Sequence, residues 1–114
     1  MEDDDAIRVL IQDLLENAGY AVSTARTGTE GLERVGEARP DVILLDKLMP
    51  QGDGTLFARE YRRRPGPHAP IVALCASHDA EEWSRSIDAA AIVVKPFDIG
   101  HLLAAVSAQL RAAG

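Results

Sequence analysis

Three short, unbroken apolar runs constrain the fold of this chain more than any other feature. They lie within Asp41–Asp46, Ile71–Cys75 and Ala91–Val94. A strand with one face in water alternates apolar and polar residues, whereas a strand covered on both faces reads as a continuous apolar run. The runs therefore predict a doubly wound α/β fold, in which helices cover both faces of a parallel sheet.

Helical patterns separate these runs, as parallel strands require. The clearest begins at Ala6, where apolar residues recur at three- and four-residue intervals until Gly19 stops the helix. Asp79 and Asp98 have the character of helix N-caps. The predicted helices cover residues 6–18, 29–38 and the stretch through 56–61, two more begin near Asp79 and Asp98, and a short strand is predicted at Tyr20–Val22.

The length and charge of the chain exclude several classes of protein. Its 114 residues fit a single domain, 1–114, and we expect no separate DNA-binding or enzymatic output domain. The net charge of −6 argues against direct nucleic-acid binding, which uses clustered Lys and Arg. No run reaches the roughly 18 apolar residues that cross a bilayer. The acidic start is unlike a signal peptide, so we expect a cytoplasmic protein with no membrane partner.

Charged residues mark the strand ends where ligands bind in parallel sheets. Glu2 and Asp3 open the chain, Asp46 ends one buried strand, and Lys95 ends another. Carboxylates held close together repel one another unless a cation intervenes, and Mg²⁺ (or Mn²⁺) prefers oxygen ligands. Asp46 could then attack a phosphoryl donor, while the metal and Lys95 neutralise charge on the phosphoryl oxygens.

Each of these motifs also has a plainer interpretation when it stands alone. The acidic run Glu2–Asp5 could complement the dipole of the helix that follows. Asp46 could cap a loop, and Lys95 could simply end a strand before Pro96. All three motifs occur together, in this order along the chain. Their combination favours a phosphoryl-transfer site over the plainer interpretations.

Together the motifs resemble the receiver domains of two-component response regulators, over essentially the whole chain. The residues that carry the resemblance are Glu2-Asp3, Pro40 to Asp46, Met49-Pro50, Asp53-Gly54 and Val94-Lys95-Pro96-Phe97. The resemblance implies a sheet of order 2-1-3-4-5, phosphorylation of Asp46 and a cis peptide bond before Pro96. It also implies that Lys95 clamps the phosphoryl group.

The resemblance further implies the metal ligands and the partners. Asp3, Asp46 and the Leu48 carbonyl would bind the metal directly, and Glu2 would act partly through water. The phosphoryl donor would be a sensor histidine kinase or a phosphotransfer protein, and the signal would pass to a downstream protein target.

The chain departs from the family pattern at three places. Cys75 stands where the family usually has Thr or Ser, and Ile92 stands where an aromatic side chain commonly switches rotamer. We therefore expect the usual switch to be weakened or rerouted. Of the first strand only Met1 remains, so strand 1 is truncated or missing. The strand Asp41–Asp46 then has an apolar edge, and pairing of two chains there would give a homodimer.

Two other classes of function compete with the phosphoacceptor module. A pseudo-receiver would keep the fold and act as a binding module without phosphorylation. A phosphatase is the least favoured, because such enzymes need a second Asp two residues after the nucleophile, where this chain has Leu48. We therefore expect that the chain is not an enzyme, apart from catalysing its own phosphorylation and dephosphorylation.

Overall fold

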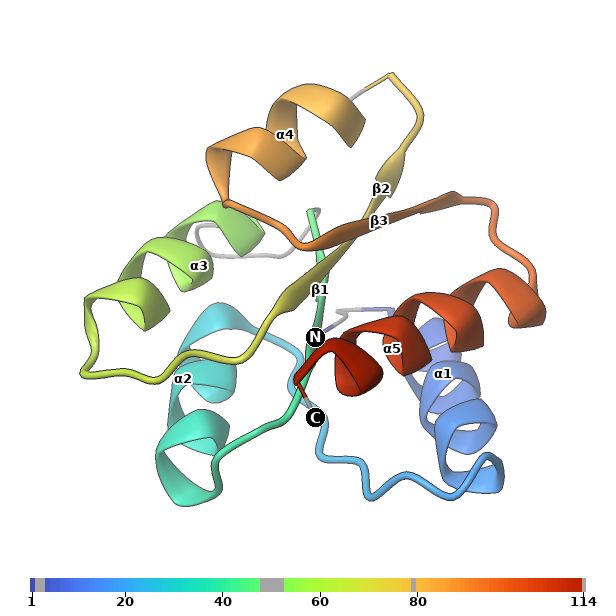
Figure 1. Ribbon diagram of the computed structural model, residues 1–114, viewed down its shortest axis with the longest axis horizontal. Coiled ribbons are helices and arrows are strands. Elements are labelled where there is room, and N and C mark those ends of the chain that lie inside the picture. The colour runs from blue at the N-terminus through green and yellow to red at the C-terminus, as the bar shows by residue number, and fades with distance from the viewer. Residues whose placement is uncertain (2–3, 48–52, 79, 114) are drawn as a thin grey trace.

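After two consecutive helices at its start, the chain alternates between strands and helices (Figure 1). The computed structural model describes residues 1, 4–47, 53–78 and 80–113. The helices in these ranges are α1 (Asp5–Asn17), α2 (Gly28–Glu37), α3 (Asp53–Arg63), α4 (Ala80–Ser86) and α5 (Ile99–Ala113), and the strands are β1 (Ile43–Asp46), β2 (Ile71–Ala76) and β3 (Ala91–Lys95). The three buried strands were predicted from the apolar pattern. The helix that became α4 was predicted from an N-cap at Asp79, a residue that lies outside the described ranges.

The described strands form one parallel sheet in the order β1-β2-β3. Asp46 aligns with Leu74, and Ala76 aligns with Lys95. These strands correspond to the third, fourth and fifth strands of the predicted order. Because the strands are parallel, the carboxyl ends of β1 and β3 lie at the same end of the sheet, on either side of β2.

Helices cover both faces of this sheet, which confirms the doubly wound fold. One face, with Leu74 and Val93, packs against α1 and α5 through Ile11 and Leu102. The other face packs against α3 and α4, and side chains of α2 extend this second cluster. Figure 1 shows α1 and α5 together on one side of the strands. In the described ranges no helix has the length and apolar character needed to cross a membrane.

The predicted strand at Tyr20–Val22 is wrong. Residues 20–25 have no strand structure, and the Tyr20 N–H donates to the Leu15 carbonyl at the end of α1 instead (3.1 Å). A strand forms only where a neighbour takes its backbone hydrogen bonds. The neighbour expected for this segment was strand 1, and the described sheet, β1-β2-β3, has no strand that pairs with residues 20–25.

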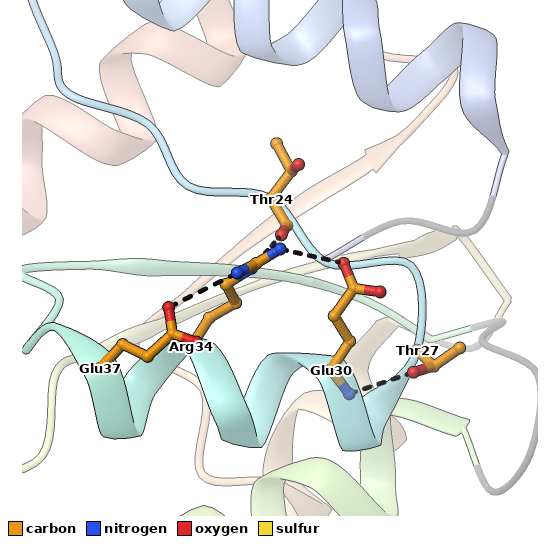
Figure 2. Close-up of polar contacts among 5 residues, drawn as sticks. All are labelled: Thr24, Thr27, Glu30, Arg34 and Glu37. Carbon is orange, nitrogen blue, oxygen red and sulfur yellow. Dashed lines mark hydrogen bonds and ion pairs between the residues drawn. The ribbon is translucent and has the colours of Figure 1, made fainter.

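Side chains, rather than a β-ladder, hold this segment to α2 (Figure 2). Nε of Arg34 donates to the Thr24 carbonyl (3.2 Å), and its guanidinium also pairs with Glu37 (3.4 Å) and Glu30 (3.8 Å). Thr27 begins α2, because its hydroxyl accepts a hydrogen bond from the Glu30 N–H (3.1 Å).

Candidate functional site

Asp46 ends β1 as a buried carboxylate, with a side chain only 2% exposed. Its backbone N–H donates to the Met1 carbonyl (3.1 Å), and the following N–H, of Lys47, donates to the Leu74 carbonyl (3.0 Å). The residue is therefore fixed from both sides, by Met1 and by β2. A carboxylate removed from water in this way needs a charged or hydrogen-bonding partner.

That partner is the ammonium group of Lys95, which forms an ion pair with Oδ2 of Asp46. Neighbouring strands lie about 4.8 Å apart, so β1 and β3 are separated by roughly 10 Å. The long Lys95 side chain spans β2 where the aligned residue is the small Ala76. Lys95 keeps 28% of its side chain exposed, so the pair lies at the border between the core and solvent.

Cys75 lies on the opposite face of the sheet from this pair. Side chains alternate along a strand, and Asp46 aligns with Leu74 rather than with Cys75. Cys75 is 2% exposed and belongs to the cluster that contains Trp83, with Ile92 packed against the same cluster. The two residues that depart from the family pattern therefore share one face of the sheet.

Three of the predicted metal ligands, Glu2, Asp3 and Leu48, lie outside the described residues. Within the described ranges, His, Cys, Asp and Glu form no group of three that could hold a metal. Asp4, which is described, caps the N-terminus of α1. Its carboxylate accepts a hydrogen bond from the Ile7 N–H (3.1 Å).

Met1 and Gly54 also contact Asp46, and these contacts were not predicted from the sequence. Met1 bonds to the backbone of Asp46, as described above. Gly54, in the first turn of α3, packs so closely that an added Cβ would lie 2.7 Å from the Asp46 carbonyl oxygen and 2.9 Å from Trp83. The sequence motif Asp53-Gly54 resembles the family loop but does not by itself reveal this contact.

Comparison with known families identifies the chain. Residues 1–107 match the family model described as the response regulator receiver domain. The chain belongs to this family. It is therefore a receiver domain of two-component signal transduction rather than a conventional enzyme, and receiver domains generally depend on Mg²⁺. The cis peptide bond between Lys95 and Pro96, which the resemblance implied, is present.

Relatives of known name are response regulators. The response regulator MprA of Mycobacterium leprae (strain TN) is 38% identical over 113 residues, which cover 97% of this chain and 49% of MprA. The transcriptional regulatory protein CseB of Streptomyces coelicolor is 39% identical over 116 residues, which cover 100% of this chain and 49% of CseB. This receiver domain thus spans about half the length of these relatives.

Solved receiver structures share the fold. The chemotaxis response regulator CheY4 of Vibrio cholerae superimposes with a TM-score of 0.87 at 32% identity, covering 96% of this chain and 93% of CheY4. The receiver domain of the Francisella response regulator 1452 gives a TM-score of 0.88 at 26% identity, covering 99% of this chain and 94% of the other. These comparisons give no support to a phosphorylation-independent pseudo-receiver.

Proposed function

We propose that Asp46 of this receiver domain accepts a phosphoryl group in a Mg²⁺-dependent reaction and that Lys95 clamps the phosphoryl group. The observation that carries the proposal is the ion pair between the buried Asp46 carboxylate and the Lys95 ammonium at the carboxyl ends of β1 and β3. An acyl phosphate forms on a carboxylate, and its added negative charge needs a fixed cation beside it. The pair supplies both groups.

The transfer is a displacement at phosphorus. An oxygen of the Asp46 carboxylate forms a bond to the phosphorus, while the bond from phosphorus to the donor nitrogen of a phosphohistidine breaks and its electron pair stays on the imidazole. Lys95 moves from a carboxylate oxygen to a phosphoryl oxygen, so its charge stays paired throughout. Its long side chain allows this movement at the border of the core.

The residues proposed as ligands have the chemistry that a magnesium ion prefers. The proposed ligands, which are the carboxylates of Asp3 and Asp46 and the Leu48 carbonyl, with Glu2 acting partly through water, are all hard oxygen donors. The acidic pair follows Met1 directly in the chain, and Met1 is hydrogen-bonded to Asp46. When bound, Mg²⁺ neutralises negative charge on the phosphoryl oxygens.

We further propose that residues 1–114 act as one receiver unit that takes its phosphoryl group from a sensor histidine kinase or phosphotransfer protein. Its output is a contact with a downstream protein, and an acidic chain of this kind does not itself bind nucleic acid. One relative is named a transcriptional regulatory protein, but this chain spans only 49% of it. A cytoplasmic location and a homodimer stay predictions.

Intact-mass spectrometry tests the proposal. The protein is incubated with acetyl phosphate and Mg²⁺, and we expect one added phosphoryl group that disappears when the metal is chelated. Asp46→Asn should abolish the added mass. Asp13→Asn removes an exposed carboxylate on α1 and should leave the added mass unchanged. Equal labelling of the Asp46→Asn variant, or no labelling of a folded wild-type protein, would overturn the proposal.

A further inference from the structure

A series of direct contacts links the end of β1 to α4 through the first turn of α3. Gly54 lies in that turn, and its N–H donates to the Lys47 carbonyl (3.4 Å). A Cβ added to Gly54 would lie 2.7 Å from the Asp46 carbonyl oxygen and 2.9 Å from the indole ring of Trp83. Gly54 therefore packs against the backbone of Asp46 on one side and against α4 on the other.

A hydrogen bond attaches Trp83 to the same turn of α3. Its Nε1–H donates to the Thr55 hydroxyl (2.8 Å), and the residue is 5% exposed. A buried indole N–H usually has a hydrogen-bond partner, so this bond fixes the orientation of the ring. Trp83 thus holds two consecutive residues of α3, Gly54 by packing and Thr55 by hydrogen bonding.

The other end of α3 is also attached to α4. Nη2 of Arg62 donates to the carbonyl of Asp88, just after the end of α4 (3.0 Å). Asp88 has a left-handed backbone conformation (φ 54°), which is common just after the end of a helix. Two polar bridges therefore join α3 to α4. Because the contacts between them are closely packed, a displacement at the first turn of α3 is passed to α4.

Cys75 and Ile92 lie in the same cluster as Trp83, but they offer a weaker connection to the site. The thiol of Cys75 is a poor hydrogen-bond donor, and the Ile92 side chain has no polar group. The Trp83 indole has both a large packing surface and a strong donor. The connection between Asp46 and α4 that the contacts support therefore runs through α3.

We propose that Trp83 is a positioning residue for the phosphorylation of Asp46, acting through Thr55 and Gly54. This inference rests on the proposed function of Asp46. A phosphoryl group adds negative charge beside the peptide that Gly54 contacts, so it changes the surroundings of the indole. Coupling between two binding events is reciprocal. A first turn already held by Trp83 need not be ordered on binding, so its release lowers the affinity for a phosphoryl analogue.

Binding of beryllofluoride, a phosphoryl analogue, in the presence of Mg²⁺ tests the proposal. Trp83 is the single tryptophan, so the protein has one indole N–H signal in NMR spectra. We expect the analogue to shift this signal in the wild-type protein and not in Asp46→Asn. Thr55→Val removes the acceptor and should weaken binding about fivefold, the effect of one ordinary hydrogen bond. Thr55→Ser keeps the acceptor and should bind like the wild type.

Ser107→Ala is the matched control, because the Ser107 hydroxyl accepts a hydrogen bond from Arg111 within α5 (2.6 Å). It should leave the affinity unchanged. The double variant of Thr55→Val and Trp83→Phe should bind no more weakly than Trp83→Phe alone, because both changes remove the same bond.

The outcomes separate this inference from the proposed function. If the analogue binds while the indole signal stays in place, or if the losses in the double variant add, the coupling through Trp83 is overturned and the function of Asp46 stands. If a folded wild-type protein neither binds the analogue nor reacts with acetyl phosphate, the proposed function fails, and this inference fails with it.

Discussion

At the scale of single residues, the Asp46–Lys95 pair combines a stability cost with a chemical role. The two partners differ in their access to water, because the Lys95 side chain is 28% exposed and the Asp46 side chain is 2% exposed. Without Asp46, Lys95 can extend into solvent, whereas without Lys95 the Asp46 carboxylate stays buried and loses this cation. The pair is therefore asymmetric, and removing its cation is the more damaging change.

Lys95→Met should lower the free energy of unfolding by about 2 kcal/mol, and Asp46→Asn should lower it by less than about 1 kcal/mol. In the double variant the loss from Lys95→Met should be largely restored, since no charge remains buried. Urea unfolding of all four proteins gives the coupling energy. Additive effects of the two substitutions would show that the ion pair does not stabilise the fold.

A second residue-scale prediction concerns Cys75 and Ile92. A thiol is a weaker hydrogen-bond donor than the usual hydroxyl. A phosphoryl analogue bound at Asp46 should therefore shift the NMR signals near Asp46 much more than those of Cys75 and Ile92. Large shifts around both residues in the wild-type protein would contradict a weakened switch.

At the scale of elements, the sequence predicted those strands whose burial is visible in their own residues. Ile71–Cys75 is apolar throughout, and this pattern alone identifies a strand covered on both faces. Tyr20–Val22 looked like a strand as well, but whether it forms one depends on a neighbour that the segment itself does not encode. Local pattern predicts an element only where tertiary pairing is available to it.

The packing of α3 against the site gives a prediction at this scale. In Gly54→Ala the new Cβ would meet the Asp46 carbonyl and Trp83, so α3 must move, at a cost of about 2 kcal/mol. Gly36→Ala is the matched control in α2, where the nearest atom is the flexible end of Arg64 at 3.5 Å. It should stabilise by about 0.5–1 kcal/mol. Thermal unfolding measures the stability of both variants. Equal changes in melting temperature would contradict the close contact at Gly54.

At the scale of the whole molecule, the strand-end rule predicted which residues meet. Asp46 and Lys95 are 49 positions apart, and both end parallel strands, so the sequence sufficed to bring them together. The contact of Met1 with Asp46 could not be predicted in the same way. It depends on how the start of the chain packs beside β1, which no local pattern in the sequence indicates.

Metal binding should stabilise the whole domain if the acidic site forms as proposed. Mg²⁺ at about ten times its Kd should add about 1.4 kcal/mol, which raises the melting temperature by roughly 6 °C in a domain of this size. NaCl at equal ionic strength is the control for screening. Asp46→Asn should lose most of the Mg²⁺ effect. An equal response to NaCl would indicate that only general charge screening acts on this acidic chain.

The central claim is that the phosphoryl group resides on Asp46, and locating it chemically tests this most directly. Borohydride reduces an acyl phosphate to an alcohol, so the phosphorylated protein is reduced, digested and sequenced by mass spectrometry. The account predicts one reduced side chain, at position 46, that requires both Mg²⁺ and the phosphodonor. Reduction at another carboxylate, or phosphate retained on a Ser, Thr or His side chain, would contradict it.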